Sequence, residues 1–295
     1  MKHLHNKTLE IVLNSSDQER IASIRKFKWI GYTQATKIMK KLDVLMNYPR
    51  SHRMPNMLLV GDSNNGKTVL LNRFSRLNES HLKSETNELV CPIIMIQAPP
   101  EPDEKRFYNS ILEALYAPYK SSEKIEMRQT RVIHLLKKVE TKMLIIDEIH
   151  HVLAGNMSKQ RTFLNVIKYL SNELKISIVC SGTRDAFNAI QTDPQLANRF
   201  VPTVLKKWRN DEGYLRLLAS FETVLPLKEP SLLVEPSLSK KILLKSEGLI
   251  GEISKILELS TILAIESGIE KINKNIIDNI DYISPGDRRK MIHKI

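Results

Sequence analysis

A glycine-rich stretch with the spacing G-x-x-x-x-G-K-T has the clearest chemistry in this sequence. The stretch and the position after it comprise Gly61, Asp62, Ser63, Asn64, Asn65, Gly66, Lys67, Thr68 and Val69. An apolar run at 57–60 precedes it and helical apolar spacing continues over 69–74, so we expect a strand, a loop and a helix in this order. Glycine lets backbone N–H groups approach phosphate oxygens, and a helix start adds partial positive charge. The pattern therefore predicts a P-loop that binds nucleotide phosphates and not a plain connecting turn.

Two residues of this loop have separate expected roles. Lys67 should reach the β- and γ-phosphates of the nucleotide, where its ammonium group offsets their negative charge. The hydroxyl of Thr68 should complete the coordination of a Mg²⁺ ion, which prefers oxygen ligands and keeps most of its waters. We therefore expect the nucleotide to bind together with Mg²⁺.

Two consecutive carboxylates, Asp147 and Glu148, follow an apolar run at 143–146 that is typical of a buried strand. In a doubly wound sheet such a strand ends beside the P-loop, at the edge where ligands bind. Asp147 is expected to hold Mg²⁺ through water, and Glu148 to polarise the water that attacks the γ-phosphate. Acidic pairs also cap helices. With a P-loop about 80 residues upstream, however, this pair predicts nucleotide hydrolysis.

Polar and aromatic side chains elsewhere are further candidates for this site. A polar side chain after the apolar run 176–180 could touch the γ-phosphate or the attacking water, and Thr183 or Ser181 fits this role. Trp29 and Tyr32 lie at a break between two amphipathic stretches. An aromatic ring there either packs on a neighbouring element or covers an adenine ring, and the sequence leaves both alternatives open.

The order of apolar runs predicts an α/β fold, with a five-stranded parallel sheet flanked by helices and a small all-helical lid at the C-terminus. The expected strands are 57–60, 91–96, 143–146, 176–180 and 201–207, and the polar segment 78–88 is interpreted as a loop. We expect residues 1–15 to form a flexible arm. Residues 16–227 should form the nucleotide-binding domain with an N-terminal helical extension, and residues 228–295 the helical lid.

The charge of the chain is unevenly distributed. The net charge of the chain is +12. Residues 228–295 contribute little to it, because they contain 11 Lys and Arg against 10 Asp and Glu. Residues 1–227 contain the other 34 Lys and Arg and the other 23 Asp and Glu. A one-sided basic surplus favours a polyanionic partner, with nucleic acid the first candidate. A well-solvated basic surface would have the same composition.

Composition also excludes several classes of protein. No apolar run is long enough to span a membrane, and the N-terminus lacks the apolar core of a signal peptide. We therefore expect a cytoplasmic protein without a membrane partner. Cys91 and Cys180 lie in apolar runs and are interpreted as buried core residues, not as a disulfide. His134 has no second ligand at metal spacing and is interpreted as structural.

Five segments together resemble the TniB/TnsC type of AAA+ ATPase, which regulates DNA transposition, including in CRISPR-associated transposons. They are Trp29-Ile30-Gly31-Tyr32, the P-loop 61–68, Asp147-Glu148, Ser181-Gly182-Thr183-Arg184 and Gln195-Leu196-Ala197-Asn198-Arg199-Phe200. The resemblance covers about residues 20–263. The P-loop and the acidic pair occur in many ATPases, so the first and last segments narrow the choice.

The resemblance implies an ATPase that binds ATP and Mg²⁺ and assembles with itself into rings or helical filaments on double-stranded DNA. It also implies two protein partners, a transposase and a TniQ-like targeting protein, which the chain would connect, with hydrolysis driving disassembly. By this resemblance the Walker A residues are Lys67 and Thr68, the Walker B residues are Asp147 and Glu148, and Thr183 lies near sensor 1.

Arg199 and the lid are expected to determine how fast ATP is hydrolysed and whether hydrolysis depends on assembly. Arg199 matches the arginine finger, which would stabilise charge on the nucleotide of a neighbouring protomer; its alternative is a surface ion pair. Where many AAA+ proteins have a sensor 2 arginine, the segment 248–253 has none and the nearest cation is Lys255. We therefore expect slow, assembly-dependent hydrolysis.

The resemblance and the basic surplus together place the expected DNA contacts between the second and third strands. The candidates are Lys105, Arg106, Arg128, Thr130 and Arg131. They would follow the phosphate backbone without reading bases, which gives salt-sensitive binding with little sequence preference. A solvated helix face is the alternative for each of them. Two other functions stay open, a signalling or scaffold ATPase that assembles on a protein partner and an ATPase similar to a helicase loader.

Overall fold

The structure, a computed structural model, describes residues 1–26, 28–154, 156–191 and 197–292. The chain divides into two compact units. One unit is Gln34–Lys206, and the other combines Met1–Thr33 with Lys207–Ile295. We call the first the sheet unit and the second the helical unit.

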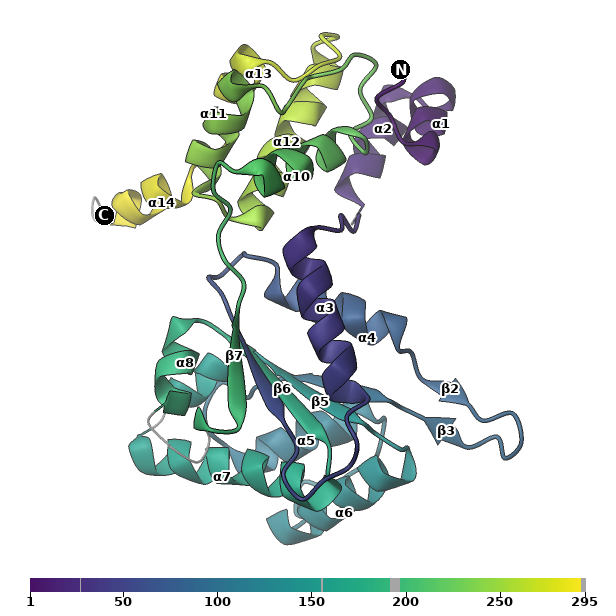
Figure 1. Cartoon of the computed structure of the whole chain (residues 1–295), viewed down its shortest axis with the longest axis vertical. Helices are drawn as coiled ribbons and strands as arrows, with labels where there is room; N and C mark the ends of the chain where they lie inside the picture. Colours follow the sequence, from purple (N-terminus) through teal and green to yellow (C-terminus); the bar gives the residue numbers. More distant parts are fainter. Residues whose placement is uncertain (27, 155, 192–196, 293–295) are drawn as a thin grey trace. The chain divides into compact units, whose positions relative to one another are not determined.

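A five-stranded parallel sheet forms the centre of the sheet unit (Figure 1). In spatial order its strands are β4 (Ile93–Gln97), β5 (Met143–Asp147), β6 (Ser177–Gly182), β1 (Asn56–Val60) and β7 (Phe200–Val204). Val179 of β6 lies opposite Met57 of β1 on one side and Ile145 of β5 on the other. β1, β5 and β6 are buried along their whole length, which explains their continuous apolar sequences. The predicted five-stranded parallel sheet is confirmed.

Helices flank the sheet (Figure 1). They are α3 (Thr33–Met46), α4 (Lys67–Leu77), α5 (Glu104–Ala114), α6 (Ile125–Lys138), α7 (Met157–Leu174) and α8 (Arg184–Gln191), with the 3-10 turn η1 (Ile149–Ala154) after β5. Apolar residues of α5, α6, α7 and α8 recur at helical spacing and form the core with the strands. At this core the rings of Phe107 in α5 and Phe163 in α7 meet edge to face, with centroids 5.1 Å apart.

A short antiparallel ribbon begins inside the segment 78–88, which is interpreted as a loop, and ends just after it. Its strands are β2 (His81–Leu82) and β3 (Leu89–Val90), in which Leu82 lies opposite Leu89. Both of these leucines are exposed, at 59% and 47%. Two-residue strands with exposed side chains leave no apolar alternation in the sequence, so the ribbon could not be read from the pattern.

The helical unit joins the two ends of the chain. Its helices are α1 (Asn6–Asn14), α2 (Asp17–Arg25), α10 (Glu212–Glu222), α11 (Pro236–Ser246), α12 (Ile250–Glu266), α13 (Lys274–Asn279) and α14 (Pro285–Ile292). Tyr214, Ile253 and Ile256 are fully buried in its apolar core. α2 starts with a capping box, since Ser16 accepts a hydrogen bond from the Glu19 backbone and the Glu19 carboxylate accepts one from the Ser16 backbone.

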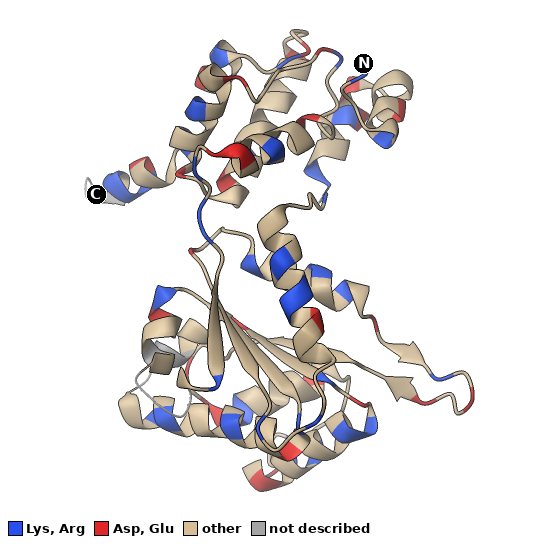
Figure 2. Cartoon of the chain, in the orientation of Figure 1, with Lys and Arg blue, Asp and Glu red and all other residues tan. Residues whose placement is uncertain are grey.

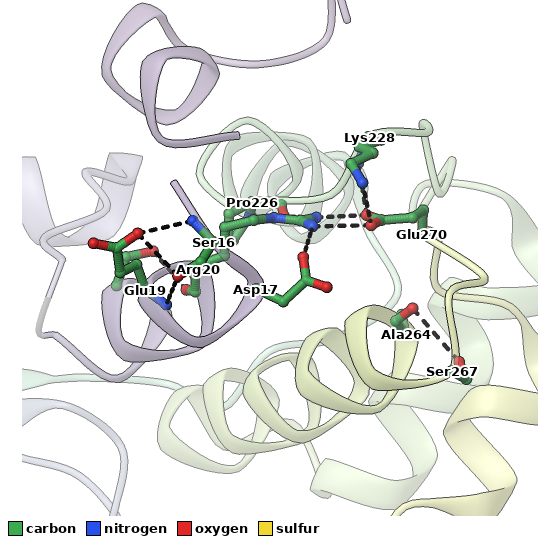
Figure 3. A network of polar contacts seen from close by, with 10 residues as sticks. Ser16, Asp17, Glu19, Arg20, Pro226, Lys228, Ala264, Ser267 and Glu270 are labelled. Carbon is green, nitrogen blue, oxygen red and sulfur yellow. Dashed lines mark hydrogen bonds and ion pairs between the residues drawn. The ribbon is translucent and has the colours of Figure 1, made fainter. Parts of the chain in front are cut away.

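A buried ion network ties α2 to the C-terminal part of this unit (Figure 3). Arg20, 1% exposed, donates hydrogen bonds to Glu270 (Nη1 to Oε1, 2.9 Å), to the Pro226 carbonyl (3.1 Å from Nε) and to Asp17 (2.7 Å). Burial alone would raise the pKa of Glu270, but hydrogen bonds from Arg20 and Lys228 outweigh it and lower that pKa to about 2. Glu270 is therefore held as a carboxylate.

The two compact units have boundaries that differ from those of the expected domains, which are 1–15, 16–227 and 228–295. Residues 6–14 of the expected arm form α1, which buries Thr8 and Val12, and residues 1–33 group with the C-terminal helices. Residues 207–227, which contain α10, also belong to the helical unit. The cause is contact across the chain, since Arg20 and Glu270 are 250 positions apart. Among the described residues no helix is both long and apolar enough to cross a membrane.

Candidate nucleotide-binding site

The P-loop has the backbone shape that its sequence predicts. It connects β1 to α4, and Asn64 (φ +59°) and Gly66 (φ +85°) adopt left-handed conformations. Gly61 is close to the segment after β7, since a Cβ there would meet the carbonyl oxygen of Leu205 at 3.1 Å. The buried amide of Asn65 donates a hydrogen bond of 2.8 Å to the same oxygen. The loop is thus anchored to the chain that follows β7.

Lys67 is buried in this loop, with 4% of the residue exposed. Its Nζ donates hydrogen bonds of 2.9 Å to the carbonyl oxygens of Gly61 and Asp62. Burial lowers the pKa of Lys67, and the charges of Glu148, Asp147 and Asp62 act in the opposite direction. An ammonium group has three donor hydrogens, so two carbonyl acceptors leave a donor for an anion such as a phosphate.

The two residues expected to hold Mg²⁺ lie together. The Thr68 hydroxyl at the start of α4 donates a 2.6 Å hydrogen bond to Oδ2 of Asp147 at the end of β5. The other carboxylate oxygen of Asp147 accepts a 2.9 Å hydrogen bond from the Glu148 backbone N–H. A hydroxyl beside a carboxylate fits the oxygen ligands that Mg²⁺ prefers.

Glu148 follows Asp147 in a left-handed backbone conformation with φ +55°. Its side chain is partly buried, and Oε2 lies 3.1 Å from Nδ1 of His150. No motif in the sequence marks His150. Its contact with Glu148 depends on the turn after β5, which residue types alone do not specify.

Two hydroxyls at the end of β6 lie at the same edge of the sheet. The backbone N–H of Gly61 donates a 3.1 Å hydrogen bond to the carbonyl of Gly182, between Ser181 and Thr183. The side-chain oxygens of Ser181 and Thr183 are buried, and within the described part of the chain neither has a hydrogen-bond partner. Because an unpaired buried hydroxyl is costly, a polar ligand beside β6 would satisfy them.

The remaining P-loop candidates are at the surface of the protein. Asp62 and Ser63 are exposed, and Val69 is exposed in the first turn of α4. The structure therefore brings the P-loop, Asp147 and the end of β6 together in one unit. The residues fit the phosphates of a nucleotide and a Mg²⁺ ion.

The aromatic candidates belong to the helical unit. The ring of Tyr32 packs edge to face on Trp208, with centroids 5.1 Å apart, and burial raises the pKa of Tyr32 to about 12. Trp29 is partly buried. This packing is the first of the two alternatives for Tyr32, and a contact of either ring with adenine stays a prediction.

Arg199, the expected arginine finger, lies directly before β7 and is partly buried. Its Nη1 donates a 2.7 Å hydrogen bond to the side-chain oxygen of Asn172 in α7. This partner is a neutral amide, so the charge of Arg199 is not neutralised by that contact. Gln195 and Leu196 of the same sequence segment lie outside the described residues.

Four of the five DNA candidates have side chains that reach the surface of α5 and α6. Arg106 is 61% exposed and lies 3.7 Å from Asp103. Lys105 donates to the Ser121 carbonyl, Thr130 donates to the Glu126 carbonyl, and Arg131 pairs with Glu123 at 2.8 Å.

Arg128 differs from the other four because it is fully buried, with 0% exposed. Its guanidinium donates to Asn109 and to the carbonyls of Lys120, Ser121 and Glu123, and it lies 4.9 Å from the ring centre of Tyr119. These contacts hold the connection between α5 and α6 against α6. Because a group without exposed surface cannot reach a phosphate, burial excludes Arg128 as a DNA contact.

Comparison with known proteins assigns the chain to a family. The family model described as "Bacterial TniB protein" matches residues 20–210. None of the curated proteins compared with this chain matches it.

Solved structures with a similar fold are AAA+ proteins. The Aeropyrum pernix ORC2 protein, solved in ADPNP–ADP complexes, has 12% identity and a TM-score of 0.62 over 89% of this chain and 72% of its own. The A. pernix ORC1 protein in complex with DNA has 14% identity and a TM-score of 0.56 over 92% and 69%. Cdc6p from Pyrobaculum aerophilum has 15% identity and a TM-score of 0.58 over 85% and 67%. The chain therefore has the AAA+ fold, and it belongs to the TniB family.

Proposed function

We propose that this protein is an ATP-dependent, DNA-binding AAA+ regulator of DNA transposition. It assembles on double-stranded DNA as a ring or filament and connects a TniQ-like targeting protein to the transposase, and ATP hydrolysis drives disassembly. The observation that carries the proposal is the meeting of two motifs: Thr68 Oγ1 lies 2.6 Å from Asp147 Oδ2, although the two residues are 79 positions apart. The family match over residues 20–210 supports the link to transposition.

The chemistry of hydrolysis is assigned to residues at one edge of the sheet. The backbone of the P-loop and Lys67 bind the phosphates, and Thr68 and Asp147 hold Mg²⁺ directly or through water. Bound Mg²⁺ supplies positive charge to the phosphate oxygens. Glu148 accepts a proton from the attacking water, and Thr183 orients that water or the γ-phosphate.

Arg199 is assigned the role of making hydrolysis depend on self-assembly. Its side chain is held by Asn172 at 2.7 Å, a neutral partner that leaves the guanidinium charge for the nucleotide of a neighbouring protomer. An arginine supplied by a second subunit stabilises transition-state charge only when subunits meet. Hydrolysis then depends on assembly.

The DNA surface is assigned to α5 and α6, through Lys105, Arg106, Thr130 and Arg131. The sheet unit carries 25 Lys and Arg against 17 Asp and Glu, and its outer helices display many of these cations (Figure 2). The A. pernix ORC1 structure shows that a protein of this fold was solved in complex with DNA. Phosphate contacts of this kind position a protein without reading sequence.

Electron microscopy tests the assembly. Wild-type protein with duplex DNA and a non-hydrolysable ATP analogue should form rings or filaments around the DNA, and the Lys67→Ala variant should not. Nucleotide-dependent oligomers that form equally well without DNA would contradict the proposal and favour a scaffold ATPase. A complex that forms only with a replicative helicase would favour a helicase loader.

A salt titration tests the surface. The double variant Lys105→Ala/Arg106→Ala should bind duplex DNA about 10-fold more weakly at moderate salt, with the log–log salt slope reduced by about 2. The matched control is Lys137→Ala/Lys138→Ala, which removes two exposed cations from the C-terminal end of α6, whereas Lys105 and Arg106 lie in the first turn of α5. Equal weakening by both pairs would mean that total charge, and not this surface, determines binding.

A further inference from the structure

Three side chains with metal-ligating atoms lie together in the turn after β5. One such atom from each of Glu148, His150 and His151 lies within 4.8 Å of the other two, and all three residues are partly buried. Imidazole nitrogens and carboxylate oxygens are ligands of Zn²⁺ and related transition metals, whereas Mg²⁺ takes oxygens. The group therefore differs in chemistry from Thr68 and Asp147, the residues proposed to hold Mg²⁺.

Two atoms of this group approach each other without a hydrogen bond. Nδ1 of His150 lies 3.1 Å from Oε2 of Glu148. Nδ1 is a buried atom, and within the part of the chain that the structure describes it has no hydrogen-bond partner. A buried polar atom without a partner is costly in free energy. A metal ion between the two side chains would satisfy both atoms, and it requires no proton on either of them.

The separation of these two atoms fits a tetrahedral ion. Two ligands of tetrahedral Zn²⁺, each about 2.1 Å from the metal, lie about 3.4 Å apart. Nδ1 of His150 and Oε2 of Glu148 are 3.1 Å apart, so one ion can reach both after small movements. The third atom, from His151, lies within 4.8 Å of the other two, a distance that a side-chain rotation can shorten. A water molecule would complete the fourth position.

The backbone holds the three side chains in one turn. Glu148 has a left-handed conformation with φ +55°, and its carbonyl accepts a 3.0 Å hydrogen bond from the backbone N–H of His151. Behind the turn, a Cβ on Gly182 would lie 2.6 Å from the Cβ of Ala186 and 3.1 Å from Cγ2 of Ile149. Glycine at this position therefore permits η1 to pack closely on β6 and α8. Because the backbone is already held, less conformational entropy is lost when an ion binds.

We propose that Glu148, His150 and His151 form a binding site for a divalent transition-metal ion such as Zn²⁺. An ion bound there occupies the carboxylate that the proposed function assigns to activation of water, so it stops hydrolysis. Lys67 and Thr68 are not part of this site, so ATP still binds. The metal site follows from the residues of the turn, whereas its effect on hydrolysis rests on the proposed function.

Zinc binding by the full chain is measured without nucleotide and without Mg²⁺. Zn²⁺ is titrated against a chromophoric zinc indicator, and the thermal unfolding midpoint is recorded with and without Zn²⁺. The variants are His150→Ala and His151→Ala. The control is His134→Ala, which changes an exposed histidine of α6 in the same unit. Co²⁺, whose visible absorption depends on its ligands, serves as a second probe.

The expected results identify the ligands. Wild type and His134→Ala should bind Zn²⁺ with equal affinity, and the ion should raise the unfolding midpoint of both. His150→Ala and His151→Ala should each bind Zn²⁺ about 10-fold or more weakly, because each loses one of three protein ligands. The absorption of bound Co²⁺ should change in the same two variants.

Two results would overturn the metal site. One is a wild type whose unfolding midpoint does not respond to Zn²⁺, and the other is equal zinc affinity in wild type and in either variant of the turn. The midpoints recorded without Zn²⁺ show whether each variant is folded. His151→Ala changes a partly exposed side chain, so it keeps the comparison decisive if His150→Ala does not fold.

Steady-state hydrolysis of ATP in excess Mg²⁺ tests the effect of the ion. Buffered Zn²⁺ should lower the kcat of wild type about 10-fold or more with KM within about 2-fold, and a zinc-selective chelator should restore it. His151→Ala should need about 10-fold more Zn²⁺ for the same fractional inhibition. Zinc that binds and leaves kcat unchanged would overturn the inferred effect on hydrolysis. A wild type that hydrolyses no ATP would contradict the proposed function, and the zinc titration would still decide the metal site.

Discussion

Two buried cations, Arg20 in the helical unit and Lys67 in the sheet unit, differ in what surrounds them. Arg20 has carboxylates of Glu270 and Asp17 within hydrogen-bond distance, and the hydrogen bond with Glu270 raises the pKa of Arg20 against the effect of burial. The close contacts of Lys67 are two backbone carbonyls, and burial lowers its pKa.

The difference separates a structural charge from a binding charge. A buried cation that is paired and fully hydrogen-bonded fixes one conformation, and removing either partner leaves an uncompensated charge. A buried cation whose hydrogen-bond acceptors are neutral carbonyls keeps an unfavourable desolvation energy that nearby carboxylates offset only in part, and a bound anion can offset more of it. This is the arrangement expected of the phosphate site that we propose for Lys67.

Arg128 sharpens this rule. It too is buried, and within the part of the chain that the structure describes it has no carboxylate at hydrogen-bond distance, but its Nε, Nη1 and Nη2 atoms all donate to oxygens of the chain. Burial among neutral acceptors therefore does not by itself mark a binding cation, and the place of Lys67 in the P-loop at the start of α4 is what distinguishes it from Arg128.

The largest effect is expected from removing the binding charge. Lys67→Ala should weaken ATP binding by about 30-fold or more, because loss of a buried charge partner costs about 2–5 kcal/mol. The free energy of unfolding should change little, since a poorly compensated buried cation is lost. Titration with a fluorescent ATP analogue measures the affinity, and the exposed Lys137→Ala serves as control. If Lys67→Ala bound ATP with the same affinity as the control, Lys67 would not be a nucleotide-binding residue.

Removing the structural charge of Arg20 should instead lower the stability of the protein and leave its affinity for ATP nearly unchanged. Arg20→Ala should lower the free energy of unfolding of the helical unit by about 3–5 kcal/mol, since it leaves Glu270 buried without its buried partner and with only the half-exposed Lys228 as a cation. The affinity for ATP should stay within about 2-fold of wild type. Urea unfolding followed by circular dichroism gives the stability change.

The network offers a matched control for this change. Lys228 also pairs with Glu270, at 3.1 Å, but its side chain is 53% exposed. Lys228→Ala should therefore cost less than about 1 kcal/mol. Equal losses of stability in the Arg20 and Lys228 variants would mean that burial of Arg20 adds nothing to the network.

The nucleotide site could be predicted in large part because its signals are local. The P-loop spacing places Lys67 and Thr68 within eight consecutive positions, and Asp147 ends a strand whose apolar run is continuous. Parallel strands bring such ends to one edge of the sheet, so their meeting follows from the fold class. The five-strand sheet was predicted for the same reason.

What could not be predicted depends on contacts between distant residues or on exact backbone geometry. The helical unit joins residues 1–33 to 207–295 through pairs such as Arg20 and Glu270, which leave no periodic pattern in the sequence. Burial of Arg128 depends on how the connection 115–124 folds over α6. The contact of His150 depends on the left-handed turn at Glu148, which is unusual for a residue other than glycine.

A smaller and pH-dependent effect is expected from Glu270 itself. Its pKa is about 2 in the folded protein against an ordinary value of 4.5, so its carboxylate stabilises the fold fully at pH values above about 4.5. This contribution, at most about 3 kcal/mol, should be lost progressively as the pH falls from about 4.5 towards 2. Urea unfolding of wild type and Glu270→Gln across this range measures it. The two proteins should differ most near neutral pH and converge in acid, because protonation then makes wild-type Glu270 resemble the amide. A stability difference that is independent of pH would show that the carboxylate charge, and hence its pairing with Arg20, is not what holds α2 to the C-terminal helices.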